Sequence, residues 1–266
     1  MDNLSAVECF LLDMDGTFYL GDDLLPGAEE FLQFIGESKS KYIFLTNNSS
    51  KNSRDYHRKL EKLGLEVPPE NIVTSGEVTA GYIKNKQQGA TVYLVGTEKL
   101  KQDFVERGLH VTRKKEDDPD FLVLGFDTTL NYQKLWDAHD LILSGIEYIA
   151  TNPDLVCPLE NGATMPDCGS MIKLLETSTG GHRPRVIGKP NTLMIDYISE
   201  KTDIARQKMA LVGDRLYTDI KTANKAGINS ILVLTGETGR EDLQASKNKP
   251  DYIFSSLKEM LQVVSD

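Results

Sequence analysis

Short apolar segments alternate along this chain with segments of helical periodicity. In the N-terminal part, the pattern predicts a strand at residues 7–12, a helix near 28–38, a strand at 42–45 and a helix at 53–62. Near-continuous apolar strands separated by amphipathic helices are typical of a parallel sheet that is covered on both faces. The sequence therefore predicts an α/β fold with a doubly wound parallel sheet.

The same alternation returns near the C-terminus. Three further strands of this sheet are predicted at residues 186–187, 209–212 and 230–234, with one helix after Pro190 and another at 218–226. Because both ends of the chain show one architecture, we expect them to form a single core, interrupted in sequence by the segment between them.

The middle segment has strands and helices of its own. Its apolar runs and helical periodicity predict elements at 91–95, 98–107, 121–125, 132–144 and 148–150. About one hundred residues with this apolar content can form a separate small core. We therefore expect residues 1–80 and 182–266 to form a discontinuous core, and residues 81–181 to form an inserted α/β domain that returns through a hinge at Gly180 and Gly181.

The charge balance narrows the class of partner. Forty acidic against thirty basic residues give a net charge of −10, which disfavours a nucleic acid polymer or an anionic membrane and suits a divalent cation. No apolar stretch approaches the roughly 20 residues of a membrane span, and the N-terminus lacks the pattern of a signal peptide. The cysteines Cys9, Cys157 and Cys168 have no C-x-x-C spacing, so we expect a reducing, cytoplasmic environment.

Polar residues gather directly after each predicted strand of the core sheet. The carboxyl ends of parallel strands meet at one edge, where doubly wound sheets bind their ligands. The residues at these ends are Asp13 and Asp15, then Thr46, Asn47 and Asn48, then Gly188, Lys189 and Pro190, and finally Gly213, Asp214 and Arg215. Any one of them has an ordinary explanation as a helix cap or a turn. Together, the acids, the hydroxyl, the amides and the lysine indicate a catalytic site.

Asp13 and Asp15 form the most constrained pair. Residues two apart in a strand point to the same side, so both carboxylates emerge together before the turn at Gly16. Such a pair is tolerated if a cation sits between the two, if one is protonated, or if one turns away. Each arrangement is useful to catalysis, although an Asx turn closing a strand would also place an acid here.

Four motifs carry a resemblance to a known family. The chain has D-x-D-G-T at 13–17, T-N-N at 46–48, G-K-P at 188–190 and G-D-R-x-x-T-D at 213–219. In this order they resemble the haloacid dehalogenase (HAD) superfamily of phosphotransferases. An insertion of about a hundred residues between the second and third motifs resembles its para-nitrophenylphosphatase and NagD-like branch. The resemblance implies a Rossmann-like core with a cap domain, bound Mg²⁺ and an aspartyl-phosphate intermediate.

The resemblance also implies roles for the core residues. Asp13 would be the nucleophile, and with an ordinary pKa of about 3.9 its carboxyl needs no activating base at neutral pH. Asp15 would protonate the leaving group and later activate water. Lys189 would offset the charge of Asp13 and the phosphoryl oxygens. The metal ligands would be the carboxylates of Asp13 and Asp214 and the backbone carbonyl of Asp15, with Asp219 behind them orienting a metal-bound water or Lys189.

Contacts to the phosphoryl group are expected from the first two motifs. The Thr46 hydroxyl and the backbone amides around Asn47, Asn48, Asp15 and Gly16 would hydrogen-bond its oxygens, most strongly in the transition state. Gly16 would let the backbone approach the phosphate closely.

Contacts to the rest of the substrate are expected from the inserted domain. Its loops at 151–154 and 166–170 would reach the site through Asn152, Asp154 and Asp167. Proteins that resemble this chain accept nucleotides, sugar phosphates, pyridoxal phosphate or aryl phosphates, and no residue here chooses among them.

Other functions would use the same residues. A metal-independent dehalogenase-type hydrolase would attack carbon through Asp13, but it would not need Asp15, Asp214 and Asp219 together. A phospho-acceptor regulatory module also gathers acids, a hydroxyl and a lysine at strand ends, but such modules are much shorter and need no insertion. A dinucleotide-binding oxidoreductase would need G-x-G-x-x-G after the first strand, which this chain lacks. We expect a Mg²⁺-dependent phosphatase of small molecules, whose inserted domain could supply the surface of a homodimer.

Overall fold

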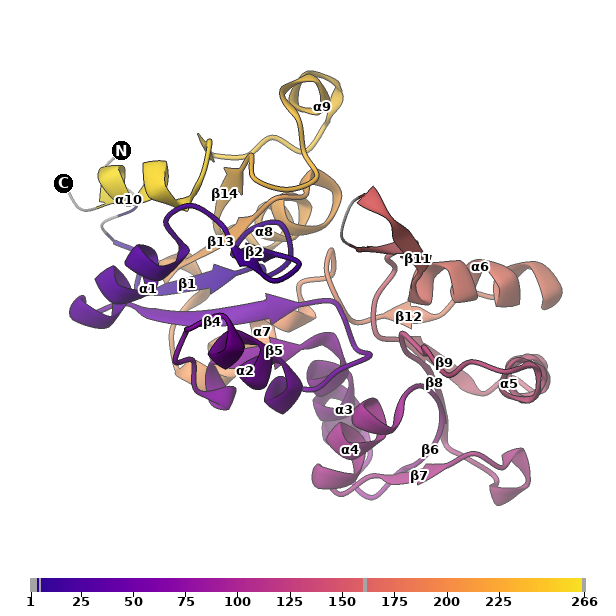
Figure 1. The fold of residues 1–266 in the computed structure, drawn as a ribbon. Helices are drawn as coiled ribbons and strands as arrows, with labels where there is room; N and C mark the ends of the chain where they lie inside the picture. The colour runs from indigo at the N-terminus through magenta and orange to yellow at the C-terminus, as the bar shows by residue number, and fades with distance from the viewer. Residues whose placement is uncertain (1–3, 5, 160–161, 265–266) are drawn as a thin grey trace. The chain divides into compact units, whose positions relative to one another are not determined.

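The computed structural model describes residue 4, residues 6–159 and residues 162–264. Its contacts divide the chain into two compact units. The core unit comprises Met1–Thr46, Tyr56–Val73 and Lys189–Asp266, and the inserted unit comprises Asn47–Asp55 and Thr74–Gly188. Each unit has its own sheet flanked by helices (Figure 1).

The core unit is built on a six-stranded sheet with the order β15-β14-β13-β1-β4-β5. Its strands are β1 (Cys9–Leu12), β4 (Lys41–Thr46), β5 (Ile72–Thr74), β13 (Met209–Gly213), β14 (Asn229–Val233) and β15 (Tyr252–Phe254). The pairs from β15 to β4 are parallel, and Leu11 lies opposite both Ile43 and Leu211. In chain order, β4 and β5 are added on one side of β1, and β13, β14 and β15 are added on its other side. The predicted α/β, Rossmann-like fold is confirmed, and the strand order reverses between β1 and β13, where such sheets bind ligands.

Helices connect these strands and cover the sheet. They are α1 (Ala28–Glu37), α2 (Ser53–Lys62), α7 (Leu193–Thr202), α8 (Lys221–Ala226), α9 (Arg240–Ala245) and α10 (Leu257–Val264), and a short hairpin of β2 (Tyr19–Leu20) and β3 (Asp23–Leu24) follows β1. In the buried cluster beneath them, the ring centroids of Phe10 and Phe31 lie 5.5 Å apart and those of Phe18 and Phe44 lie 4.8 Å apart, both edge to face. Because Phe18 belongs to the turn after β1, this packing anchors that turn.

The inserted unit has a parallel five-stranded sheet with the order β12-β9-β8-β6-β7. Its elements are α3 (Ser75–Lys86), β6 (Thr91–Val95), α4 (Glu98–Glu106), β7 (His110–Thr112), β8 (Phe121–Leu124), α5 (Tyr132–Leu143), β9 (Glu147–Ala150), the hairpin of β10 (Val156–Pro158) and β11 (Thr164–Pro166), α6 (Cys168–Ser178) and β12 (Arg185–Val186). Tyr93, Leu122 and Leu175 belong to a buried apolar cluster within this unit. The inserted unit therefore has a hydrophobic core of its own.

One strand predicted for the core sheet belongs to the other sheet. The sequence predicts a core strand at residues 186–187, but Arg185–Val186 form β12 and pair with β9. The pairing continues beyond the strand, because Ile187 N donates to Ala150 O at 3.0 Å. The prediction is wrong because a two-residue apolar run has no face pattern that could identify its sheet.

Two other segments differ from the sequence pattern. Residues 166–170, predicted as a loop, contain the start of α6, because Asp167 accepts a hydrogen bond from Cys168 N and caps this helix. The helix predicted at 218–226 begins as a π-helical turn at Leu216–Ile220 and continues as α8. The elements β5, α3, β7, β15 and α10 have no counterpart among the predicted elements, because their sequences are short or only weakly periodic.

Gly180 and Gly181 end α6. Both have positive φ, 75° and 100°, and Gly181 N donates to Glu176 O at 2.8 Å, which satisfies a carbonyl of the last helical turn. The inserted unit runs on to Gly188, so the expected hinge lies inside it. By its contacts, the main part of the inserted unit begins just before α3 and ends at Gly188. The domain borders expected from the sequence, at residues 80/81 and 181/182, stay a prediction.

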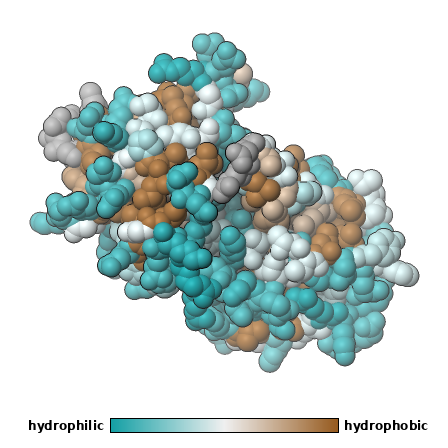
Figure 2. Space-filling view, in the orientation of Figure 1, coloured by the Kyte–Doolittle hydropathy of each residue, from teal (hydrophilic) through white to brown (hydrophobic). Residues whose placement is uncertain are grey.

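The face drawn in Figure 2 carries both hydrophilic and hydrophobic residues. On the face that Figure 2 shows, hydrophilic residues surround separate hydrophobic patches. The exposed rings of Tyr132 and Trp136 on α5 pack on each other with their centroids 6.3 Å apart, which reduces the apolar area that each shows to water. Within the described residues, no helix is both long enough and apolar enough to cross a membrane.

Asp103 of α4 is a buried carboxyl inside the inserted unit. Its Oδ2 atom has no hydrogen-bond partner among the described residues. Burial raises the pKa of Asp103 to about 7, against the attraction of the Arg107 guanidinium and with the repulsion of Glu77. The ionised form of Asp103 therefore costs folding free energy that the protonated form does not.

Replacing Asp103 by Asn is expected to stabilise the protein more at pH 8 than at pH 5. The folded-state pKa of Asp103 lies above its unfolded value of about 3.9, so stability falls as the pH rises from about 4 to about 7. Above that range the cost is on the order of a few kcal/mol, since one pKa unit corresponds to about 1.4 kcal/mol. Thermal melting of both proteins at the two pH values measures this. Equal differences in Tm at pH 5 and pH 8 would contradict it.

Candidate active site

The carboxyl end of β1 positions Asp13 and Asp15. Asp13 continues the strand pairing, because its N–H donates to Val212 O of β13 at 2.9 Å. The chain then makes a tight turn, in which Met14 O accepts from Phe18 N at 2.9 Å. The side chain of Asp13 is 12% exposed and that of Asp15 is 40% exposed. The turn therefore gives the two acids different surroundings, one buried and one open to water.

Lys189 is the cation that compensates Asp13. Its Nζ donates to Asp13 Oδ1 at 2.5 Å, to Asp219 Oδ1 at 2.6 Å and to Leu45 O at 3.2 Å. All the ammonium protons of this buried side chain thus have acceptors. Burial alone would lower the pKa of Lys189, but the attraction of the two carboxylates outweighs it and keeps that pKa above the usual range of lysine.

Replacing Lys189 by Met is expected to destabilise the protein by roughly 3–5 kcal/mol at pH 8, because two buried carboxylates lose their counter-charge. The loss is expected to be smaller at pH 5, where Asp13, whose pKa burial raises, can take up a proton. We also expect kcat to fall about a hundredfold. Urea unfolding and phosphate release measure the two effects. Lys208→Met is the matched control, since it breaks the exposed ion pair of Lys208 with Glu8 and is expected to cost less than about 1 kcal/mol.

Asp214 follows β13 and joins two other carboxylates. Its Oδ2 accepts from Glu237 N at 2.7 Å, whereas its Oδ1 is buried and has no hydrogen-bond partner among the described residues. Carboxylate oxygens of Asp13, Asp214 and Asp219 lie within 4.8 Å of one another. Burial raises the pKa of both Asp13 and Asp214, with Lys189 opposing it most at Asp13 and Asp219 adding to it at Asp214. Clustered carboxylates with an orphaned oxygen fit a divalent cation, which would lower both pKa values.

Two glycines leave room for the Asp214 carboxylate. A Cβ on Gly16 would lie 2.6 Å from Asp214 Oδ2, and one on Gly236 would lie 2.0 Å from the same atom. Both distances are shorter than van der Waals contact, so any side chain at either position would displace Asp214. Gly16 also has φ 82°, which L side chains rarely adopt.

The segment after β14 is a part of the site that sequence reasoning missed. Thr235 Oγ1 donates to Gly16 O at 2.7 Å, and Glu237 N holds Asp214. The Glu237 carboxylate also lies 3.0 Å from Arg215 Nε. A signal was available, because this segment follows a predicted strand of the same sheet and the strand-end rule includes it.

The remaining core residues stand at the same sheet edge. Asp15 Oδ1 lies 4.0 Å from Lys59 Nζ of α2. Thr46 is buried and ends β4, the neighbour of β1. Asp219 accepts from Arg215 N at 3.2 Å as well as from Lys189. The structure thus brings together the predicted residues Asp13, Asp15, Gly16, Thr46, Lys189, Asp214 and Asp219 at this edge.

The other predicted substrate residues lie in the inserted unit. Asn152 is fully buried, and its Nδ2 donates to Asn47 O at 2.9 Å while its Oδ1 accepts from Asp154 N at 3.0 Å. Asn47 Nδ2 in turn donates to Asp154 Oδ2 at 3.1 Å. Asn48 Oδ1 accepts from the backbone N–H two residues later, and Asp167 caps α6. Each of these residues has a structural partner inside the unit, and their contact with substrate stays a prediction.

Two family models match the chain. One, described as haloacid dehalogenase-like hydrolase, matches residues 10–110, and the other, described as HAD-hydrolase-like, matches residues 186–260. The first match includes Asp13 and Thr46, and the second includes Lys189, Asp214 and Asp219.

Individual proteins match over nearly the whole chain. The acid sugar phosphatase of Staphylococcus haemolyticus is 34% identical over 248 residues, which is 93% of each chain. The solved 4-nitrophenylphosphatase of Thermotoga maritima is 49% identical, with a TM-score of 0.93 over 98% of both chains. The glycerol phosphate phosphatase of Mycobacterium tuberculosis, solved in complex with magnesium, is 34% identical, with a TM-score of 0.90 over 98% of this chain and 78% of its own.

Proposed function

Since this phosphate-monoester hydrolase belongs to the haloacid dehalogenase-like family, in its para-nitrophenylphosphatase and NagD-like branch, we propose that it works through a phosphoryl group carried on Asp13. The observation that carries this proposal is the buried Asp13 carboxylate, 2.5 Å from Lys189 Nζ, at the sheet edge where the strand order reverses. A carboxylate fixed in this way can attack phosphorus without a base.

The reaction has two displacements at phosphorus. In the first, an oxygen of Asp13 bonds to phosphorus while the bond from phosphorus to the ester oxygen breaks. The ester oxygen keeps that electron pair and takes a proton from the Asp15 carboxyl. In the second, Asp15 removes a proton from water, and the water oxygen displaces the Asp13 carboxylate from phosphorus. Free phosphate leaves, and both acids return to their starting states.

Charge compensation is the main task of the surrounding residues. Lys189 offsets the negative charge where Asp13 and the phosphoryl oxygens meet, and Asp219 holds Lys189 in place at 2.6 Å. The Gly16 amide, which the sequence predicts as a phosphate donor, instead donates to Tyr19 O at 2.9 Å, so that prediction is wrong. The Thr46 hydroxyl and the backbone amide of Asp15 donate to the phosphoryl oxygens. Such donors are worth most when charge develops in the transition state.

Mg²⁺ completes the proposed site. The carboxylates of Asp13 and Asp214 and the backbone carbonyl of Asp15 would hold it, and the orphaned Oδ1 of Asp214 supports this assignment. The magnesium complex of the glycerol phosphate phosphatase is consistent with the same ion. When bound, Mg²⁺ neutralises charge on the transferring phosphoryl group.

The substrate class is a small phosphate ester. The names of the related enzymes point to sugar phosphates, glycerol phosphate and aryl phosphates, and nucleotides and pyridoxal phosphate belong to the same proposal. In the inserted unit, Asn47, Asn48, Asn152, Asp154 and Asp167 would select among them. A cytoplasmic location fits the free thiols of Cys9, Cys157 and Cys168.

A phosphate-release screen tests the function. Sugar phosphates, glycerol phosphate, nucleoside monophosphates, pyridoxal phosphate and 4-nitrophenyl phosphate are compared by kcat/KM in the presence of Mg²⁺. We expect many turnovers per enzyme and a ranking in which one class of natural ester leads. A stable phosphoprotein without turnover would indicate a phospho-acceptor module instead, and halide release without metal would indicate a dehalogenase.

A further inference from the structure

Lys59 of α2 places a positive charge beside Asp15 that the reaction above leaves unused. Its Nζ lies 4.0 Å from Asp15 Oδ1 and 3.8 Å from the centroid of the Tyr19 ring. The Lys59 side chain is 25% exposed and that of Asp15 is 40% exposed, so water reaches both partners only in part. All these residues belong to the core unit.

Tyr19 gives Lys59 a fixed platform on the turn that carries Asp15. The Tyr19 ring is fully buried, and Tyr19 O accepts from Gly16 N at 2.9 Å while Tyr19 N donates to Met14 O at 3.3 Å. An ammonium over an aromatic face is attracted by about 0.5–2 kcal/mol. The Lys59 charge is therefore held at a set position relative to the turn.

We propose that Lys59 is a positioning residue, which holds the Asp15 side chain where it can give its proton to the leaving group, a role that rests on the proposed function. A half-exposed aspartate on a turn has several rotamers open to it. A nearby fixed cation favours those that turn one carboxyl oxygen toward the ammonium, by charge when Asp15 is ionised and through the C=O dipole when it is protonated, which leaves the O–H free to give its proton. Misplacement of a catalytic group by about 1 Å can cost a hundredfold in rate. If Lys59 served only to pack α2, an uncharged side chain of the same length would replace it. The experiment therefore tests the charge of Lys59.

The leaving group separates a positioning role from a structural one. When phosphorus passes to Asp13, a sugar or glycerol oxygen leaves as a strongly basic alkoxide unless Asp15 protonates it. A 2,4-dinitrophenolate is a weak base and leaves without that proton. Loss of Asp15 positioning should therefore slow alkyl esters and spare the dinitrophenyl ester. The ratio kcat/KM reports this first transfer and not the later attack of water.

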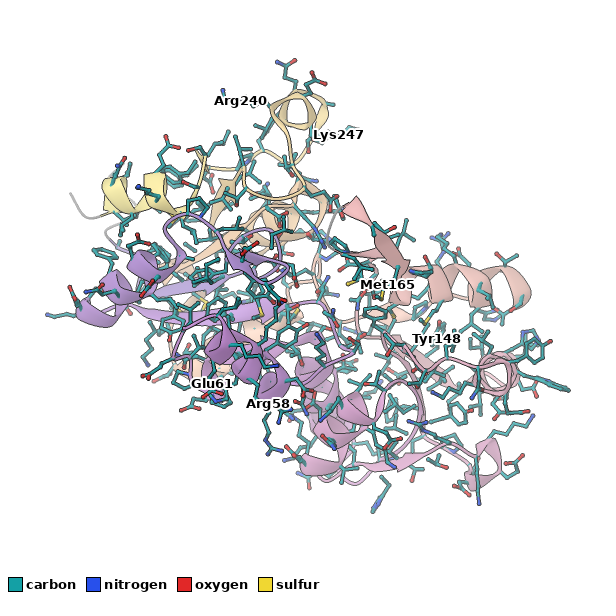
Figure 3. All side chains as sticks on the ribbon, viewed as in Figure 1. Arg58, Glu61, Tyr148, Met165, Arg240 and Lys247 are labelled. Carbon is teal, nitrogen blue, oxygen red and sulfur yellow. The ribbon has the colours of Figure 1, made fainter. Side chains whose placement is uncertain are left out.

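The experiment compares kcat/KM for glycerol phosphate and 2,4-dinitrophenyl phosphate in matched variants. Lys59→Met is expected to lose at least about tenfold on glycerol phosphate and less than about threefold on the dinitrophenyl ester. Lys59→Arg is expected to recover most of the loss, since it restores the charge. Arg58→Met, at an exposed position labelled on the same helix in Figure 3, is the control that should match the parent.

The outcomes separate this role from the proposed function. Equal losses on both esters, or no loss on either, would overturn the positioning role of Lys59. Asp15→Asn serves as the reference. If Asp15→Asn discriminates between the esters and Lys59→Met does not, only the role of Lys59 fails. If Asp15→Asn itself does not discriminate, the proton transfer assigned to Asp15 fails with it.

Discussion

Replacing Asp13 by Asn is expected to lower kcat by more than about a thousandfold while the protein stays folded. An amide of the same shape cannot form the bond to phosphorus. The first displacement therefore does not occur, and the second has no phosphoenzyme to act on. The fold should tolerate the change, because Asp13 is held mainly by β1 and Lys189 keeps its bonds to Asp219 and Leu45 O. Initial rates with saturating 4-nitrophenyl phosphate measure kcat, and thermal melting reports folding.

Asp103→Asn is the matched control for this variant. It makes the same chemical change at another buried aspartate, in the inserted unit, and it should keep turnover close to that of the parent. The parent quenched in acid during turnover should carry phosphate on Asp13, and Asp13→Asn should carry none. Turnover of Asp13→Asn above about a thousandth of the parent rate would remove Asp13 as nucleophile.

The catalytic edge is predictable because short-range patterns determine it. Asp13, Thr46 and Asp214 directly follow or end buried strands, and the carboxyl ends of parallel strands share an edge whatever their order. Lys189 is a different case. Its expected strand at residues 186–187 belongs to the inserted sheet, yet Lys189 still reaches Asp13, 176 residues earlier in the chain. The strand-end rule included Lys189 although it assigned the preceding strand to the wrong sheet, and the G-K-P motif located the residue independently.

The surroundings of the site depend on contacts that no local period encodes. The sequence places Asn152 and Asp154 in a loop that is expected to contact substrate, but it does not show that they bond to Asn47, 105 and 107 residues away. Asp167 stands in a segment rich in turn residues, and the same residue type that favours a turn also caps a helix. The charge of Lys59 beside Asp15 likewise arises only when α2 packs against the turn after β1. Side-chain partners of this kind follow from tertiary packing.

Removing Mg²⁺ is the other change expected to have a large effect. In excess chelator, kcat/KM should fall by more than about a thousandfold and return when Mg²⁺ is added back, because the charge of the phosphoryl group then lacks the counter-charge of the metal. A second readout does not depend on activity. Mg²⁺ should raise Tm, since an ion that binds only the folded protein stabilises it. That rise should be lost in Asp214→Asn, whose side chain keeps one oxygen for Glu237 N but loses the charge.

The stabilisation by Mg²⁺ has its own control in the core unit. Asp203→Asn removes a carboxylate that is exposed at the end of α7 and has φ 57°, a conformation that Asn adopts readily. Its Tm should rise with Mg²⁺ as much as that of the parent. Full activity in chelator would exclude the metal from the reaction. An equal rise in Asp214→Asn would mean that the ion binds elsewhere, and the orphaned oxygen of Asp214 would then need another explanation. Loss of the rise in Asp214→Asn alone would assign the ion to the carboxylates that meet at the ends of β1 and β13.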